Sequence, residues 1–107
     1  MSASEIKNAK IYKVTIELED GPGLICELSL CYGLTFQAFR LDAPSFAGIW
    51  ITRVLELCEA KNLNELKGKC LRVRGNDQRI EAIGHIVMED WFDPGVELFG
   101  NVRGGAK

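Results

Sequence analysis

Alternating apolar and polar residues between Lys10 and Tyr32 constrain the fold of this chain more than any other feature. A period of two places successive side chains on opposite faces, which is typical of a half-buried β-strand. The segment EDGPG at 19–23 interrupts the pattern with residues that favour a turn. We therefore predict two strands joined as a hairpin. Their apolar faces are expected to comprise Tyr12, Val14, Ile16 and Leu18 in the first strand and Leu24, Cys26, Leu28, Leu30 and Tyr32 in the second.

The clearest helix signal follows the segment LDAPS at 41–45, in which Asp42 or Ser45 can cap a helix start. From there apolar residues recur at helical spacing, and the helix is expected to end near Asn62. Its apolar stripe is predicted to comprise Phe46, Trp50, Ile51, Val54, Leu55, Leu57 and Cys58.

The remaining segments predict further strands. LTFQAFRL at 34–41 is compatible with a strand or an extended loop. CLRVRG at 70–75 and RIEAIGHIV at 79–87 alternate on either side of a turn, which indicates a second hairpin. WFDPGVELF at 91–99 is compatible with a short strand or with an aromatic plug over the end of the core.

These elements assemble in the order β-β-β-α-β-β. The expected fold is α+β, with an antiparallel sheet of about five strands and one helix packed on one face. A length of 107 residues suits a single domain, which we place at 10–99, between a flexible N-terminal lead at 1–9 and a flexible tail at 100–107. The opposite face of the sheet is left to solvent or a partner, and is expected to carry Thr15, Glu17, Glu27, Ser29, Arg72, Arg74 and His85.

Composition restricts the class of partner. With 13 basic and 15 acidic residues the net charge is −2, which argues against general nucleic-acid binding and against an acidic DNA mimic. The chain has no apolar run near the ~20 residues that span a bilayer and no apolar signal-peptide core, so a cytoplasmic protein is expected. The 4 cysteines show no C-x-x-C spacing and are interpreted as small buried apolar residues.

His85 is the single histidine of the chain, and Glu89 and Asp90 follow it closely. Along a straight strand, at ~3.3 Å per residue, His85 and Glu89 would lie about 13 Å apart, so only a tight bend would bring them to one metal. A metal site also needs at least three converging ligands. We therefore expect neither a metal nor a cofactor, and a hydrogen-bonded structural histidine. A hydrolase centred on His85 is the alternative.

Two segments are better candidates for a binding surface. In CYGLTFQAFR at 31–40, aromatic rings, an amide and a guanidinium group lie close together, a combination able to stack on a base and hydrogen-bond its edges. The alternative is that the phenylalanines simply belong to the core. The second hairpin and its lead-in carry five positive charges, either a solvated surface or a site for an anion, a nucleotide or an acidic protein. The predicted ligand- or partner-binding residues are Tyr32, Gln37, Phe39, Arg40, Arg72, Arg74, Arg79, His85 and Trp91.

Three segments, YGLTFQAFRLD, ITRVLELCEAKNLNELKGKCLRVRG and EAIGHIVMEDWFDP, resemble a family of small uncharacterised proteins encoded by bacteriophages and prophages. The shared order is Y-G-x-x-x-Q-x-F, L-D, R-x-L-E, L-x-G-K-x-x-R-V, A-I-G-H-I and W-F-D-P. The resemblance covers residues 8–95. Relatives are longer and glycine-rich before L-D, so no ligand loop is carried over to this chain.

The resemblance implies a phage accessory protein without enzymatic activity, a functional inference made by analogy. We expect a small cytosolic binding protein that inhibits a host antiviral defence system by binding a host effector, as an anti-CRISPR protein does. One alternative is a homo-oligomeric sponge that sequesters a nucleotide second messenger of host immunity. A structural or accessory virion protein is another.

Overall fold

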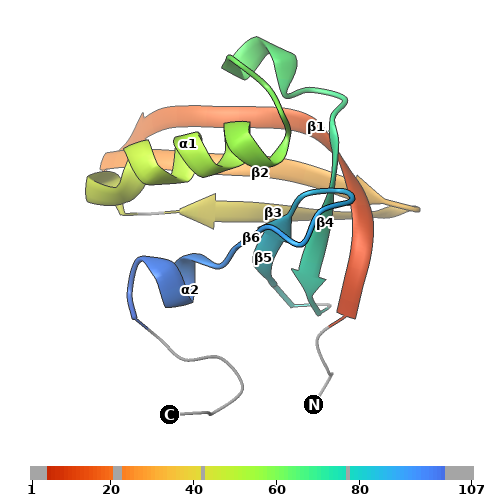
Figure 1. Cartoon of the computed structure of the whole chain (residues 1–107). Coiled ribbons are helices and arrows are strands. Elements are labelled where there is room, and N and C mark those ends of the chain that lie inside the picture. The colour runs from red at the N-terminus through yellow and green to blue at the C-terminus, as the bar shows by residue number, and fades with distance from the viewer. Residues whose placement is uncertain (1–4, 21–22, 42, 77, 101–107) are drawn as a thin grey trace.

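The computed structural model describes residues 5–20, 23–41, 43–76 and 78–100. It is an α+β fold, as predicted, with an antiparallel sheet and one main helix (Figure 1). The sheet has six strands, not about five, because residues 91–92 add a short last strand. Two short 3₁₀ helices precede α1 and β4. The elements are β1 (Glu5–Glu19), β2 (Gly23–Tyr32), β3 (Thr35–Leu41), α1 (Ala47–Leu57), β4 (Cys70–Gly75), β5 (Ile80–Gly84), β6 (Trp91–Phe92) and α2 (Pro94–Glu97).

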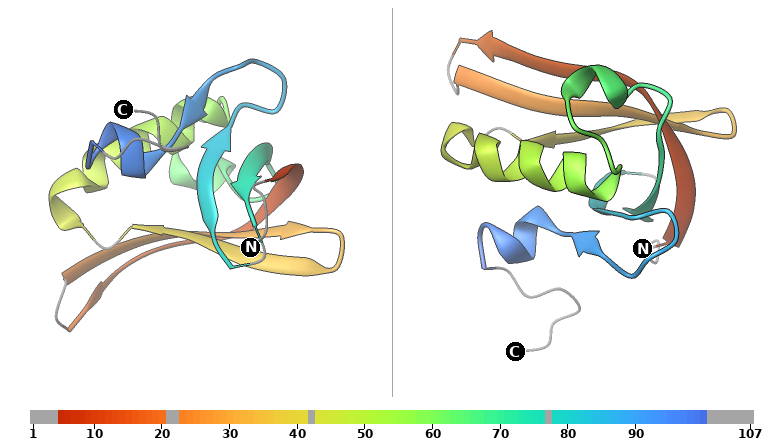
Figure 2. Two further views of the ribbon diagram at one scale, coloured as in Figure 1. Left: turned by 90° about the horizontal axis from the view of Figure 1, so that it is seen from below. Right: turned by 45° about the horizontal axis from the view of Figure 1, so that its top comes forward.

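Strand β1 belongs to both halves of the sheet. The strand order is β3-β2-β1-β4-β5-β6. From Lys10 to Glu19 β1 pairs with β2, whereas from Glu5 to Lys10 it pairs with β4. The strand curves between these halves, so that β4 and β5 turn away from the plane of β1, β2 and β3 (Figures 1 and 2). The predicted flexible lead at 1–9 is therefore wrong for residues 5–9, and residues 1–4 lie outside the described part.

Helix α1 packs into the concave side of this curved sheet (Figure 2). Trp50, Val54 and Leu57 are almost completely buried, which confirms the predicted apolar stripe. The ring of Phe39 stacks on Trp50 with centroids 6.0 Å apart and meets Phe92 edge-on at 6.2 Å. These aromatic contacts join the helix, β3 and β6 in one core.

The two ends of the helical region differ from expectation. No side chain caps either the 3₁₀ turn at Pro44–Phe46 or α1 itself, so Ser45 is not a cap; Asp42 lies outside the described residues. The helix ends at Leu57, earlier than predicted, in a Schellman motif: Ala60 N–H donates to Leu55 C=O (2.9 Å) and Glu59 N–H to Glu56 C=O (3.2 Å). Glu59 occupies the left-handed position with φ 53°, where glycine is usual.

A β-bulge changes the predicted face of β1. The pairing with β2 shifts register between Ile11 and Lys13, and an extra residue at that point reverses the alternation of side chains. Ile11 is completely buried in consequence, whereas Tyr12 is 43% exposed. Leu18, near the end of the strand, is 81% exposed. The predicted inner face is therefore wrong for Tyr12, whereas Leu18 keeps the alternation of Val14 and Ile16 but lies beyond the core; the predicted face of β2 is confirmed.

Candidate functional site

His85 is buried in the loop that follows β5, not on the exposed face of a strand as predicted, because β5 ends at Gly84. Its Nδ1 accepts hydrogen bonds from the backbone N–H groups of Val87 and Met88, both at 3.0 Å. Its Nε2 lies 2.6 Å from a carboxylate oxygen of Glu59. Since Nδ1 accepts from two donors, the ring proton belongs on Nε2 and is donated to Glu59.

This arrangement makes His85 the organiser of the loop at 85–90. Its side chain holds the middle of the loop, and its backbone N–H closes the loop by donating to Asp90 C=O at 2.9 Å. Both ring nitrogens are engaged, and the contact to Glu59 joins the loop to the end of α1. The positive φ of Glu59 thus serves two structures: it ends the helix and directs a carboxylate toward His85. Within the part of the chain that the structure describes, no group of three His, Cys, Asp or Glu side chains is placed to hold a metal ion.

Trp91 lies flat against the backbone of β5. A Cβ atom on Gly84 would come within 2.6 Å of the Trp91 indole, so the ring needs the bare backbone of that glycine. The guanidinium groups of Arg72 and Arg74 lie 4.9 Å and 5.6 Å from the centre of this ring, within the range of cation–π attraction. The predicted residues Arg72, Arg74 and Trp91 are therefore brought together, on the face of β4, β5 and β6 that is turned away from the core.

The guanidinium groups of Arg72 and Arg74 form hydrogen bonds and ion pairs within the protein. Arg72 donates to the backbone carbonyls of His85 (2.8 Å) and Met88 (2.6 Å) and forms an ion pair with Glu89 at 2.9 Å. This contact lowers the pKa of the Glu89 carboxyl, chiefly through the hydrogen bond from Arg72. Arg74 forms an ion pair with Asp93 at 2.7 Å. Both arginines thus hold the 85–90 loop and the start of α2 in place.

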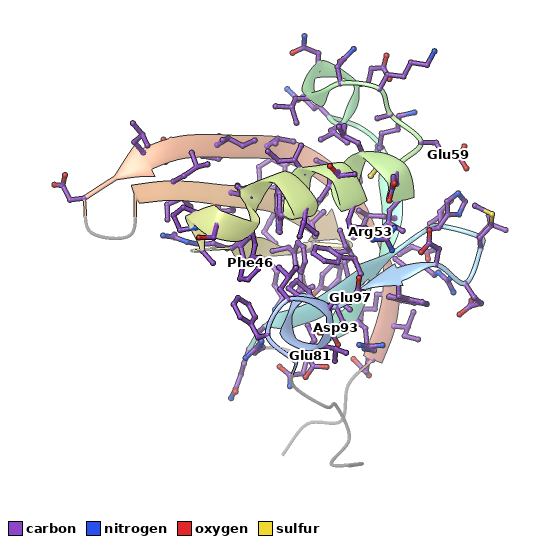
Figure 3. All side chains as sticks on the ribbon, turned by 60° about the vertical axis from the view of Figure 1, so that its left-hand side comes forward. Phe46, Arg53, Glu59, Glu81, Asp93 and Glu97 are labelled. Atoms are coloured by element: carbon purple, nitrogen blue, oxygen red, sulfur yellow. The ribbon has the colours of Figure 1, made fainter. Side chains whose placement is uncertain are left out.

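Arg53 on α1 was not among the predicted site residues, yet it makes polar contacts to three segments. It donates to Asp90 (2.8 Å) and to the backbone carbonyl of Trp91 (3.0 Å), and it lies 4.0 Å from Glu97. Figure 3 shows Arg53 and Glu97 together at the centre of the molecule. Hydrogen bonding to Asp90 is the main cause of a raised Arg53 pKa. Only its i,i+3 pair with Glu56 (2.8 Å) could have been predicted from local sequence.

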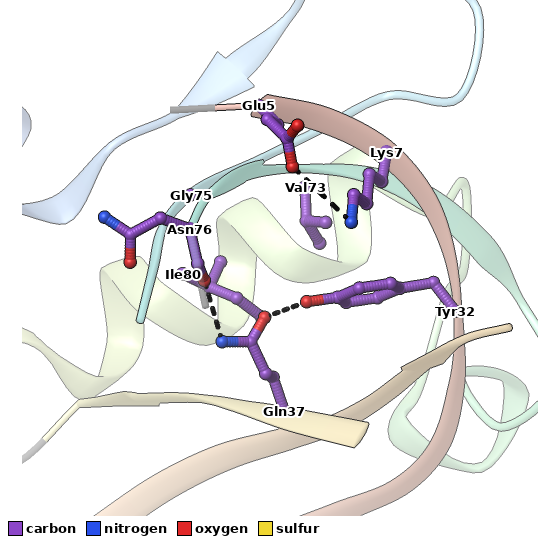
Figure 4. A pocket seen from close by; sticks show the side chains of 8 residues that line it. All are labelled: Glu5, Lys7, Tyr32, Gln37, Val73, Gly75, Asn76 and Ile80. Carbon is purple, nitrogen blue, oxygen red and sulfur yellow. Dashed lines mark hydrogen bonds and ion pairs between the residues drawn. The ribbon is translucent and has the colours of Figure 1, made fainter. Parts of the chain in front are cut away.

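The predicted base-stacking segment divides into a core residue and a surface network. Phe39 is only 3% exposed, so its prediction as a ligand-binding residue is wrong and the core alternative is correct. Tyr32 donates a hydrogen bond to Gln37, whose amide in turn donates to Asn76 C=O at 3.0 Å (Figure 4). Lys7 lies over the Tyr32 ring at 5.0 Å. The pocket beside this network holds about 10 Å³, the space of one water molecule and far less than a nucleotide base requires.

Arg40 and Arg79 lie apart from the other predicted arginines. Arg40 is on the outer face of β3, where it forms an ion pair with Glu27 at 3.8 Å. Arg79 is exposed at the turn between β4 and β5, and both arginines line an open groove beside β3. The nine predicted binding residues therefore do not form one site: they divide among the core, the Tyr32–Gln37 network, the 85–90 loop with the face around Trp91, and the groove beside β3.

Three exposed apolar side chains gather around the β2–β3 hairpin. Leu34 at its turn is 98% exposed and Phe36 on β3 is 63% exposed. Tyr12 of β1 meets the Phe36 ring edge-on, with centroids 5.2 Å apart. We refer to Tyr12, Leu34 and Phe36 as the hairpin patch. The patch was not predicted from the sequence because the bulge in β1 moves Tyr12 to the outer face.

The four cysteines are all free thiols. Cys26 and Cys58 are buried, as predicted, and burial raises the pKa of both thiols, to about 11 for Cys58. Cys31 is half-buried and Cys70 is exposed, so for Cys70 the prediction of a buried residue is wrong.

No protein-family model matches the chain, and neither a curated protein nor a solved structure matches it. Neither α1 nor any other helix among the described residues has the length and apolar character needed to cross a membrane.

Proposed function

We propose that this chain is a small phage-encoded binding protein that acts in the bacterial cytosol and inhibits a host defence system by occupying a protein effector. The hairpin patch is the observation that carries the proposal. Contiguous exposed apolar residues on a soluble domain mark interaction surfaces, and aromatic side chains contribute much of the binding energy in protein interfaces. Tyr12 and Phe36 supply two such side chains, and Leu34 extends the surface to the tip of the hairpin.

The hairpin that presents this patch is well anchored. Gly33 has φ 61° at the first position of a two-residue turn, as a type II′ hairpin turn requires. At the base of the turn, Tyr32 and Gln37 form the hydrogen-bonded network that ends at Asn76, which ties the hairpin to the β4–β5 turn. A surface held in its binding geometry loses less conformational entropy on association. These contacts therefore support a role for the hairpin in recognition.

The nucleotide-sponge alternative draws less support from the same residues, whereas the virion alternative draws on the same patch. A nucleotide sponge would use Tyr32 and Gln37, but their polar groups bond to each other and the pocket beside them has room for one water molecule. Of the arginines expected to hold phosphate, Arg72 and Arg74 make ion pairs with Glu89 and Asp93. Arg40 is paired with Glu27, and Arg79 is exposed in the groove beside β3. A virion protein would need a partner surface of its own, for which the hairpin patch is equally suited.

A plating assay tests the proposal. Bacterial strains that each carry one defence system are supplied with the protein on a plasmid and challenged with a phage that the system restricts. We expect the wild-type protein to restore plaques in at least one strain, and Phe36→Asp to abolish the effect while leaving the thermal midpoint nearly unchanged. Val87→Asp, at an exposed apolar position in the 85–90 loop, is the matched control and should retain activity. Two outcomes would argue against the proposal: plaques restored by Phe36→Asp as well as by the wild type, or no plaques restored by the wild-type protein in any strain.

A further inference from the structure

Strand β3 forms one end of the sheet, so one side of its backbone has no strand partner in the described part of the chain. The two-residue turn makes Tyr32 and Thr35 a hydrogen-bonded pair. Hydrogen-bonded and non-hydrogen-bonded pairs alternate along an antiparallel ladder. Phe36 and Ala38 pair with Cys31 and Ser29 at the non-hydrogen-bonded positions. Their N–H and C=O groups therefore point away from β2, toward the outer edge of the sheet.

A groove runs along this edge. In Figure 1 the outer edge of β3 faces β5 and α2. Beside Ala38 the groove has a volume of about 410 Å³, and its opposite wall is formed by Gln78, Arg79 and Ile80. A second hollow of about 220 Å³ continues past Arg79 and Ile80 to Phe99. At ~3.3 Å per residue, residues 37–41 of β3 offer roughly 15 Å of strand edge beside these hollows.

The charge of the groove selects the chemistry of its occupant. Arg79 is exposed at the rim, and Arg40 lies across from it with 41% of its side chain exposed while paired to Glu27. The carboxylate in the second hollow, Glu81, is half-buried and lies 4.0 Å from Arg74. Cationic groups therefore dominate the accessible rim, which favours carboxylates on the ligand.

We propose that β3 binds an extended acidic segment of a partner protein by strand addition. The backbone groups of Phe36 and Ala38 pair with the added strand, and carboxylates at alternate positions of that strand reach Arg79 and Arg40. Phe36 of the hairpin patch directly precedes Gln37 and Ala38, which line the groove, so the patch and the groove are neighbours on β3. The inference thus rests on the proposed function and specifies which part of a partner the protein recognises.

Selection from a library of random twelve-residue peptides, displayed on phage, tests this inference with the intact protein. We expect enrichment of peptides with Asp or Glu at alternate positions. A synthetic copy of an enriched peptide should shift the backbone amide resonances of residues 36–41 and 78–80 in nuclear magnetic resonance spectra. Absence of acidic enrichment, or shifts confined to residues outside these ranges, would overturn the inference.

Two substitutions separate the backbone and charge contributions. Ala38→Pro removes an outward N–H at a position where an edge strand tolerates proline, and is expected to weaken binding of the acidic peptide by about tenfold. Arg79→Glu, at an exposed turn position, is expected to weaken it by at least as much. Ala38→Val and Lys61→Glu are the matched controls and should bind as the wild type does. If Ala38→Pro fails to fold, the Arg79→Glu comparison decides. Equal binding by Arg79→Glu and the wild type overturns the inference.

The plating assay distinguishes this inference from the proposed function. Peptide binding that depends on Ala38 and Arg79 supports strand addition even if no defence system is inhibited, in which case only the cellular role is refuted. Inhibition that depends on Phe36 but is unchanged by Ala38→Pro and Arg79→Glu supports the proposed function and overturns strand addition.

Discussion

Gly84 is the residue whose substitution tests the structure most directly. Gly84→Ala would place a methyl group within 2.6 Å of the Trp91 indole, so the ring or the strand has to move. We expect a loss of about 1–3 kcal/mol in the free energy of unfolding, measured by urea denaturation. Gly48→Ala, in α1, is the matched control: nothing lies within 4 Å of the added Cβ, so a gain of up to about 1 kcal/mol is expected. Destabilisation of similar size by both substitutions would contradict the placement of Trp91.

Substitution of His85 tests whether its side chain organises the loop at 85–90. In His85→Ala the backbone N–H groups of Val87 and Met88 lose their acceptor and Glu59 loses its donor. We expect a loss of about 1–3 kcal/mol, with faster hydrogen exchange at the amides of residues 87 and 88 than in the wild type. Val87→Ala leaves these bonds intact and should exchange like the wild type. Unchanged exchange in His85→Ala would show that the ring does not organise the loop.

At the scale of elements, Arg53 joins α1 to β6 and α2. Arg53→Met retains much of the side-chain length but removes the contacts to Asp90, Glu97 and the carbonyl of Trp91. We expect destabilisation of about 1–2 kcal/mol, because these partly exposed ion pairs contribute less than buried ones. Arg53→Lys keeps the charge but not the planar fork and should be intermediate. The free energies of unfolding of the wild type and the two variants establish this ranking. If Arg53→Lys is as unstable as Arg53→Met, the stabilisation depends on the geometry of the guanidinium group and not on its charge.

The elements also show how far local sequence patterns reach. The alternation in β2, the helical stripe of α1 and the existence of the second hairpin were predicted correctly, since each depends on neighbouring residues, although β5 ends at Gly84 and not at Val87. The short helix α2 was missed, although Asp93 caps it and Pro94 begins it, a known start signal. The bulge at Tyr12 and the early end of α1, marked by the left-handed Glu59, were also missed, because neither residue is the type that usually marks such a position.

The candidate sites were less predictable than the fold. Arg72, Arg74 and Arg79 were predicted as one basic group because they lie close along the chain. The register of β4 and β5 separates them: Arg72 and Arg74 face Trp91, whereas Arg79 lies across the groove from β3. An arginine is available to a ligand only if acidic side chains from other elements do not already pair with it. Local sequence patterns carry no information about such pairs.

For the whole molecule, the shared strand β1 is the feature on which the fold depends. Deleting residues 1–9 would remove every β1–β4 pair from Glu5 to Ala9. Among the described residues, the backbone contacts left to join the two halves of the sheet would be Lys10 opposite Cys70 and the hydrogen bonds of Ile11 to Lys69 and Gly68. We expect loss of the cooperative thermal transition, monitored by circular dichroism. Deleting residues 1–4 leaves that pairing intact and should preserve the transition. A cooperative transition in the longer deletion would show that the core and these remaining contacts hold the two halves together.

The shared strand also sets an order of events during synthesis. Residues 5–10 are synthesised before their partner in β4, which follows only after β2, β3 and α1. The first half of the sheet can thus close locally, whereas the amino-terminal end of β1 waits for a contact of high sequence separation, which forms slowly. A bulky fusion at the amino terminus would therefore lie next to the part of β1 that pairs last, and would hinder its pairing with β4. A fusion at the carboxyl terminus would follow after both hairpins are complete, which makes it the better place for an affinity tag.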